Sequence, residues 1–200
     1  MTAENLPCAA GFGPYTVLDL HDLPEDGKGY ELEDGWLIEM AAGARHNYIG
    51  WSLAGILRSA ASDTDVFVCD GGEWEVSTPS GVRKPDVFVI PKDVARAAII
   101  DESPKLIPGA ELLLVVEVIS PGSASERTDR VRKVREYAAL GIPQYWLIEH
   151  QSATRIHRAV LNGGDYDWQP VVAEGTEFAA DVEADKTFRV TFDPGALLEF

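Results

Sequence analysis

The sequence has little cysteine and no long hydrophobic run. Cys8 and Cys69 are its two cysteines, and because they are far apart and form no C-x-x-C pair, a disulfide framework and a zinc ribbon are both disfavoured. The longest apolar run, residues 112–119, is interrupted by Glu117 and falls far short of the roughly 20 residues that cross a bilayer. Residues 1–13 are polar and small, unlike a signal peptide. We therefore expect a cytoplasmic protein with no membrane partner.

Positive charge is also scarce. The chain carries 17 Lys and Arg against 33 Asp and Glu, for a formal charge of -16. This balance argues against a general nucleic-acid coat protein, because phosphate binding depends on Lys and Arg. Residues 123–137 differ, with a local charge of +2 from five basic and three acidic residues: Arg127, Arg130, Arg132, Lys133 and Arg135 against Glu126, Asp129 and Glu136. The plain interpretation is a solvated helix face, and the alternative is a local basic patch.

Several functional markers are missing. The chain contains no G-x-S-x-G, no Walker loop and no G-x-G-x-x-G, so serine hydrolases, NTPases and Rossmann enzymes lack their signatures. His21, His150 and His157 show no spacing typical of metal ligands. The two cysteines likewise show no spacing typical of metal ligands. Function must therefore be sought in carboxylates and lysines.

Residues 111–149 organise the rest of the chain. A strongly apolar strand, residues 111–120, precedes a helix that we expect to begin at the capping box of residues 123–126 and to end near Leu140. Val131, Val134 and Ala138 form the expected inward stripe of that helix. Residues 143–149 follow as the next strand. A strand, helix and strand of this length form a crossover unit, so the two strands should be parallel.

The flanking segments read as helices and hairpins around this unit. Residues 1–15 form an expected loose arm, and residues 16–200 one domain. Residues 16–23 predict a short helix and residues 46–61 a longer one. Further strands are expected at 65–69, 73–77, 87–90 and 188–192, with a hairpin over 156–172.

The N-terminal part also predicts a hairpin, at residues 30–40, because Asp34-Gly35 joins two alternating runs. Its packed face should combine Tyr30 and Leu32 with Trp36, Ile38 and Met40. Glu31 should then point to the opposite face.

Three residues could carry chemistry together. Asp86 opens a strand directly after Pro85, Glu117 lies near the end of the apolar strand, and Lys133 lies on the following helix. A charge inside a core strand is costly and calls for a reason. If the two strands are neighbours, their carboxylates meet and repel unless a cation lies between them. Mg²⁺ or Mn²⁺ suits such oxygen ligands, and the lysine ammonium could orient a water or neutralise phosphate charge.

Further motifs accompany these residues within roughly residues 16–198. In order they are Y-E-L-x-D-G-x-L-I-E-M at 30–40, His46, Pro85-Asp86, E-V-I-S-P at 117–121, Asp129/Lys133/Tyr137, and G-I-P-x-Y-W-L-I at 141–148. In this order they resemble the Uma-type restriction endonuclease family of the PD-(D/E)XK nuclease superfamily.

The resemblance implies an α/β (α+β) fold, a restriction-endonuclease-like mixed β-sheet with an αβββαβ core, an N-terminal β-hairpin and a C-terminal hairpin extension. It also implies a Mg²⁺-dependent endonuclease that hydrolyses phosphodiester bonds of nucleic acid, with DNA expected. Asp86 and Glu117 would be metal ligands. The superfamily's lysine would stand two residues after the glutamate, where this chain has Ile119, so Lys133 is the expected substitute.

Other assignments stay open at this stage. Asp129 could hold Lys133 through an ion pair, because the two residues are four apart on a helix. Glu31 could add a carboxylate, and His46 could contact phosphate or simply start its helix. The basic helix would follow the nucleic-acid backbone, and a homodimer is expected by analogy. The alternative function is a catalytically inactive nuclease-like binding or regulatory module.

Overall fold

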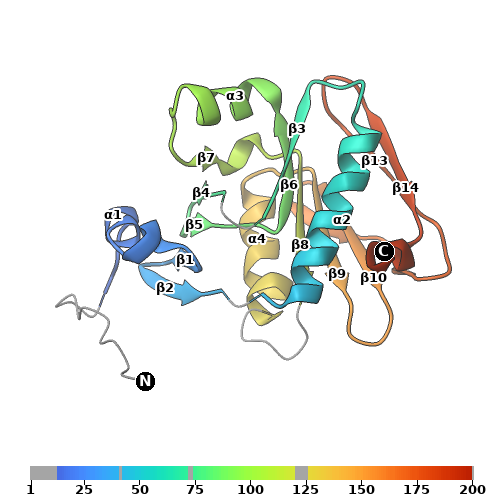
Figure 1. Cartoon of the computed structure of the whole chain (residues 1–200), viewed down its shortest axis with the longest axis horizontal. Coiled ribbons are helices and arrows are strands. Elements are labelled where there is room, and N and C mark those ends of the chain that lie inside the picture. The colour runs from blue at the N-terminus through green and yellow to red at the C-terminus, as the bar shows by residue number, and fades with distance from the viewer. Residues whose placement is uncertain (1–12, 41, 72–73, 120–125, 200) are drawn as a thin grey trace.

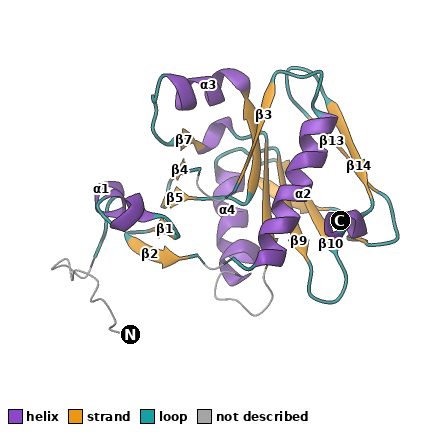
Figure 2. Ribbon diagram, viewed as in Figure 1, coloured by secondary structure: helices purple, strands orange, loops and turns teal. Residues whose placement is uncertain are grey.

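The computed structural model describes residues 13–40, 42–71, 74–119 and 126–199. A seven-stranded mixed sheet forms its centre, with the strand order β11-β10-β9-β8-β6-β3 and β12 paired to β10. Figures 1 and 2 show helix α2 crossing this sheet and the hairpin β1–β2 extending to one side of it. The predicted loose arm lies almost wholly in residues 1–12, outside the described residues.

The core of the sheet has the predicted αβββαβ order. Its elements are α2 (Ala44–Ala60), β3 (Val66–Asp70), β6 (Val87–Pro91), β8 (Leu114–Ile119), α4 (Lys133–Ala139) and β9 (Gln144–Glu149). Strand β6 is antiparallel to both β3 and β8, while β8 and β9 are parallel. The predicted crossover unit is therefore confirmed. The sheet continues through β10 (Arg155–Asn162), β11 (Asp165–Trp168) and β12 (Val172–Ala173).

Alternate residues of the central strands serve two separate cores. Val116, Val118 and Trp146 pack towards α2 and the hairpin β13 (Phe178–Val182) with β14 (Phe188–Phe192). Val115, Ile119 and their neighbours pack towards α4 and α3 (Lys92–Ile100) on the opposite face. Because both faces of β8 are covered, its sequence is almost continuously apolar. Glu117 is the buried exception.

A second, five-stranded sheet lies beside the first, with the order β2-β1-β5-β4-β7. Its strands are β1 (Tyr30–Glu33), β2 (Trp36–Glu39), β4 (Val76–Thr78), β5 (Gly81–Arg83) and β7 (Ile107–Pro108). Asp34 and Gly35 both have positive φ, as a tight hairpin turn requires, so the predicted hairpin β1–β2 is confirmed. The β4–β5 hairpin was not expected from the sequence. Within residues 81–91, strand β5 belongs to this second sheet and strand β6 to the first.

The predicted packed face of the hairpin β1–β2 is right for Tyr30 and Leu32, with Glu31 on the opposite face, and wrong for the residues assigned to it from the second strand. Leu32 pairs with Leu37, and both join Val82 and α1 (Val17–His21) in a small apolar cluster. Trp36 is instead exposed. Antiparallel partners share a face, so the register assigns Ile38 to the face of Glu31. Strand β2 lies at the edge of its sheet, and Trp36 on this strand is open to solvent.

The helical segment before β9 also differs from prediction. Residues 126–127 are helical, a π-helical turn, η3 (Thr128–Arg132), follows, and α4 completes the segment. Val131 is exposed, so the predicted Val131, Val134, Ala138 stripe is wrong in its first member. The buried positions are Asp129, Lys133, Tyr137 and Ala138. The predicted capping box at 123–126 lies largely outside the described residues.

The remaining elements are short. The 3₁₀ segments are η1 (Pro24–Gly27), η2 (Gly109–Glu111) and η4 (Pro194–Leu198). Thr16 caps α1 in a capping box with Asp19, as its sequence predicts. None of the helices within the described ranges is long and apolar enough to cross a bilayer.

Candidate active site

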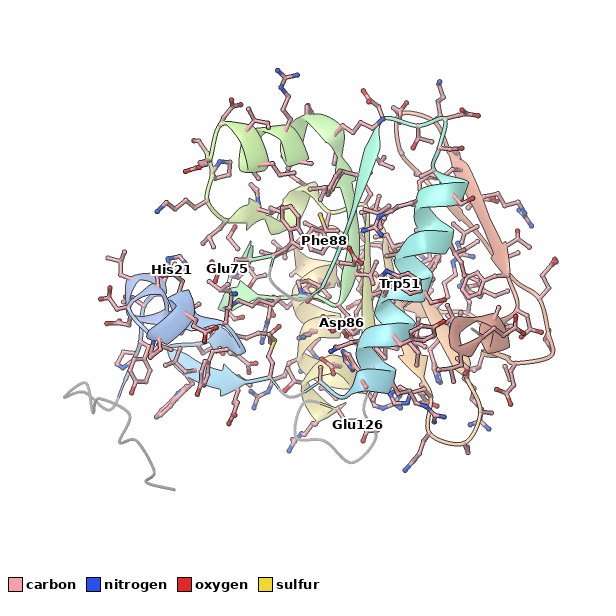
Figure 3. All side chains as sticks on the ribbon, in the orientation of Figure 1. His21, Trp51, Glu75, Asp86, Phe88 and Glu126 are labelled. Carbon is pink, nitrogen blue, oxygen red and sulfur yellow. The ribbon has the colours of Figure 1, made fainter. Side chains whose placement is uncertain are left out.

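The structure brings Asp86 and Glu117 to neighbouring positions on two strands. Val87 of β6 pairs with Val116 of β8, so Asp86 and Glu117 are the next residues outward in that antiparallel register. Residues opposite each other in such a pair project from the same face. Both carboxylates line one pocket of about 440 Å³. Figure 3 shows Asp86 beside helix α2.

Asp86 is held at both of its carboxylate oxygens. Its Oδ1 lies 2.7 Å from Nε2 of His46, at the start of α2. Its Oδ2 accepts a hydrogen bond from the backbone N–H of Val118, also at 2.7 Å. This second bond ties the end of β6 to the residue next to Glu117. His46 thus contacts a predicted ligand directly, although the sequence suggested it only as a phosphate contact or a helix-start residue.

Glu117 is anchored from helix α4. Its Oε1 accepts hydrogen bonds from Lys133 Nζ at 3.0 Å and from the Tyr137 hydroxyl at 2.9 Å. Ile119, at the position of the superfamily's lysine, is fully buried in the apolar core on this face. The helix therefore places an ammonium beside Glu117 where the strand supplies none. Tyr137 was quoted from the sequence only as part of a motif, and its bond to Glu117 could not be read from that spacing.

Lys133 is surrounded by three carboxylates. Its Nζ lies 3.0 Å from Glu117 Oε1, 3.2 Å from Glu31 Oε1 and 3.2 Å from Asp129 Oδ1. The predicted contact between Asp129 and Lys133 is therefore present. It is an electrostatic contact only, because the buried Asp129 Oδ1 accepts no hydrogen bond from the described residues. Glu31, Glu117, Asp129 and Lys133 are all buried. We call them the Lys133 cluster.

The charges of the Lys133 cluster do not balance. Burial is the largest effect on Glu117 and raises its pKa well above the usual value; Lys133 opposes this, and Asp129, Asp86 and Glu31 add to it. Burial likewise raises the pKa of Asp129 despite Lys133. Burial alone would lower the pKa of Lys133, but its carboxylate neighbours raise it instead, so the ammonium stays protonated. With all three carboxylates ionised, the site would hold more negative charge than Lys133 neutralises.

A second buried cation adjoins this cluster and was not predicted. Arg83 of β5 binds Glu31 and Glu33 at 3.2 and 2.8 Å and Glu136 of α4 at 2.8 Å. We call Arg83 and these three glutamates the Arg83 cluster. It joins the hairpin β1–β2 to α4 and leaves Glu31 between two cations. Arg83 stands three residues before Asp86, yet nothing in its sequence context indicates burial.

The carboxylates fit a divalent ion of the magnesium type. Mg²⁺ is usually held by one or two carboxylates and keeps several waters, and Asp86 and Glu117 supply such a pair at one pocket. The surplus of carboxylates over cations and the Asp129 Oδ1 that accepts no hydrogen bond from the described residues also favour a bound cation. Within the described ranges no group of three His, Cys, Asp or Glu could hold a metal alone. A cage made wholly of protein ligands is therefore not the arrangement these residues form.

Most of the basic helix is already neutralised. Arg130 pairs with Glu126 and Glu149, and Arg132 pairs with Glu33. Lys133 is buried, and Arg132 is exposed but paired, so the remaining exposed cations of the segment are Arg127 and Arg135. Neither forms an ion pair with another described residue. The segment therefore presents less positive charge than the sequence suggests.

Comparison with known proteins places the chain in a family. The Uma2 family, described as "Putative restriction endonuclease", matches residues 17–191. A solved structure of a protein described as "a putative nuclease belonging to DUF820", from Anabaena variabilis ATCC 29413, is similar with a TM-score of 0.57 and 18% identity, over 80% of this chain and 86% of that one. No curated protein matches.

The fold and the sequence match thus define a nuclease-like class of α+β protein. The chain belongs to the Uma2 family. The predicted resemblance and fold class are confirmed. The Anabaena structure supports the fold alone, because its identity to this chain is low.

Proposed function

We propose that the protein is a metal-dependent endonuclease that hydrolyses phosphodiester bonds of nucleic acid, DNA being the expected substrate. The observation that supports it most is the meeting of Asp86, Glu117 and Lys133 at one pocket, from two strands and one helix. Membership of the Uma2 family supports the same reaction class.

Asp86 and Glu117 would hold Mg²⁺ or Mn²⁺. The ion, when bound, supplies a Lewis acid and lowers the pKa of a water molecule. His46 and the Val118 N–H fix the Asp86 carboxylate, and Lys133 and Tyr137 fix that of Glu117. Such fixed geometry matters because small displacements of ligands weaken catalysis.

Lys133 would act as a permanent charge. Its raised pKa keeps the ammonium protonated, so it can donate hydrogen bonds to a water or a phosphate oxygen but cannot accept a proton. Its charge would stabilise the negative charge that develops on the phosphate in the transition state. Glu31 and Asp129 would position Lys133 rather than contact substrate, since each lies 3.2 Å from its Nζ.

Nucleic acid would approach along the exposed side of the pocket. Arg127 and Arg135 are the cations of the basic segment left to meet its backbone. A homodimer that pairs two sites remains part of the proposal by analogy.

The test is cleavage of plasmid and oligonucleotide substrates with Mn²⁺ or Mg²⁺. We expect Asp86→Asn and Glu117→Gln to reduce cleavage to background, and Lys133→Met to lower it by about 10²-fold or more. Asp181→Asn, an exposed carboxylate on β13, is the matched control and should cut normally. Circular dichroism checks that each variant folds. Cleavage that persists in both the Asp86 and Glu117 variants would falsify this assignment. If the wild type shows no turnover, the alternative function, a catalytically inactive binding or regulatory module, would be favoured instead.

A further inference from the structure

Part of the pocket has no role in the proposed hydrolysis. Trp51 of α2 lines it while remaining 60% exposed, which is unusual for the largest apolar side chain. Ile38, Met40 and Ala42 add apolar surface from β2 and the segment after it. The pocket therefore combines a carboxylate site with an aromatic and apolar wall.

Helix α2 fixes Trp51 relative to the carboxylates. His46, Asn47, Gly50 and Trp51 all line the pocket, and the pairs His46/Gly50 and Asn47/Trp51 are each four residues apart, which places the two members of a pair on the same side of the helix. His46 contacts Asp86 at 2.7 Å. Five residues advance an α-helix by about 7.5 Å, which is the scale of one nucleotide. Figure 3 labels Trp51 on helix α2 and Asp86 beside that helix.

The indole is braced but not covered. Its ring centroid lies 5.6 Å from that of Tyr48, with the planes tilted by 36°. Tyr48 is itself fixed by a hydrogen bond from its hydroxyl to the Glu199 backbone carbonyl. An aromatic ring that is held from one side and open to the pocket can stack a flat ligand without first losing conformational freedom.

The lining of this pocket offers nucleic acid little free positive charge. Its lysines are Lys84 and Lys133, and both are buried and paired, Lys84 with Glu75 at 3.3 Å. The whole chain carries -16. Stacking of a base on an aromatic ring would add an interaction that works for any sequence. In a duplex the base faces are already stacked on each other, so a base is available to Trp51 only when it is unpaired.

We propose that Trp51 is a stacking platform for an unpaired nucleobase next to the phosphate at Asp86 and Glu117, so that the pocket takes single-stranded or locally unpaired nucleic acid. This inference rests on the proposed function for its placement of the phosphate. Trp51 is a specificity-determining residue, whereas Asp86 and Glu117 carry the chemistry.

The test is binding of fluorescein-labelled oligothymidine to the full chain in EDTA, where no cleavage occurs, measured by anisotropy. We expect Trp51→Ala to weaken binding by about ten-fold or more and Trp51→Phe by less. Trp36→Ala is the matched control, because Trp36 is 61% exposed but does not line the pocket, and it should bind like wild type. An abasic strand of equal length keeps the phosphates and loses the bases, so it should bind weakly and be insensitive to Trp51→Ala.

Several results would overturn the inference. These are wild-type affinity in Trp51→Ala, an equal loss in Trp36→Ala, equal binding of the abasic strand, and duplex binding that depends on Trp51 to the same extent. A change of oligomeric state in Trp51→Ala with unchanged strand binding would assign the indole to a subunit contact instead. A chain that binds through Trp51 but never cleaves contradicts the proposed function alone, and one that cleaves independently of Trp51 contradicts this inference alone.

Discussion

Arg83 and Lys133 are both buried cations in contact with three carboxylates, yet the two clusters behave oppositely. In the Arg83 cluster burial works against ionisation, but the nearby cations prevail and lower the pKa of Glu31 and of Glu136. In the Lys133 cluster burial prevails and raises the pKa of Glu117 and Asp129. Each cluster has one cation for three carboxylates, but Arg132 and Lys133 also pair with glutamates of the Arg83 cluster and complete its charge balance. Glu117 and Asp129 have no second cation among the ion pairs of the described residues, so full ionisation would leave a surplus of negative charge in the Lys133 cluster, which a further cation could relieve.

Glu31, which belongs to both clusters, explains why their charge balances differ. Glu31 contacts Arg83 at 3.2 Å and Lys133 at 3.2 Å, so it receives two positive charges. Arg132 adds a second guanidinium at Glu33. Glu117 and Asp129 have only Lys133 in common, and Asp86 lies close by. We therefore regard the Arg83 cluster as structural and the Lys133 cluster as the functional one.

The largest predicted effect is on stability, from Arg83→Met. Removing this cation leaves three buried carboxylates without their main partner, so the free energy of unfolding should fall by about 3–5 kcal/mol, measured by urea denaturation. Arg189→Met is the control, because Arg189 pairs with Asp181 at the surface and should change stability by less than about 1 kcal/mol. A small effect of Arg83→Met would remove the structural role assigned to this cluster.

Next comes a test of whether a metal can replace a side-chain cation. Lys133→Met should also destabilise the chain, but Mg²⁺ at about 100 times its Kd should restore about 2.7 kcal/mol, because ions that bind only the folded state stabilise it. Arg83→Met keeps Asp86 and Glu117 and therefore also binds the ion, but Lys133 still repels the ion there, so this variant should gain less stability at the same Mg²⁺ concentration. Thermal denaturation with and without Mg²⁺ measures both. Equal recovery in the two variants would mean that the clusters do not differ as proposed.

The framework of the site could be predicted from local patterns. Asp34-Gly35 predicted the hairpin β1–β2, and the apolar strand followed by a helix predicted that β8 and β9 are parallel. Pro85 before Asp86 correctly placed the start of β6. These features depend on a few consecutive residues, so the sequence contains the whole signal.

The charge networks could not be predicted in the same way. Lys133 stands among arginines, which is typical of a solvated helix face, and its burial depends on Glu31 and Glu117 from two other strands. Arg83 lies in the short strand β5, whose pairing with β4 and β1 was not expected. Trp36 was assigned to the wrong face because the two-residue turn pairs it with Glu33 and pairs Leu37 with Leu32. For the two buried cations, by contrast, the deciding partners are distant in the sequence.

A smaller effect on the unfolding free energy should have opposite signs in the two clusters when one glutamate of each is replaced by glutamine. Glu117→Gln removes a carboxylate whose charge is penalised by burial, so in metal-free buffer near pH 7 the unfolding free energy should rise by about 1 kcal/mol. Glu136→Gln removes a carboxylate that Arg83 and Ser80 stabilise, so it should fall by about 1–2 kcal/mol. The two isosteric changes are each other's control under urea denaturation. Losses of similar size in both would contradict the charge surplus at Glu117.

The smallest effect is the pH dependence of stability, in which the two clusters act in different ranges. Glu31 and Glu136 have lowered pKa values, so their contribution is complete above the ordinary value of 4.5 and is lost as the pH falls through their folded-state values. Glu117 has a raised pKa, so above 4.5 the folded chain keeps a proton that the unfolded chain releases, and stability falls as the pH rises.

Metal-free wild type should therefore lose stability relative to Glu117→Gln as the pH rises from 4.5 towards neutrality, with a slope of at most about 1.4 kcal/mol per pH unit for one proton. Urea denaturation of the two proteins across this range measures the difference. Mg²⁺ should flatten the wild-type curve, because the ion competes with the proton for the carboxylate. Parallel curves in the absence of metal would show that Glu117 takes up no proton in this range, and the carboxyl group of the Lys133 cluster whose pKa is raised by burial would then have to be Asp129.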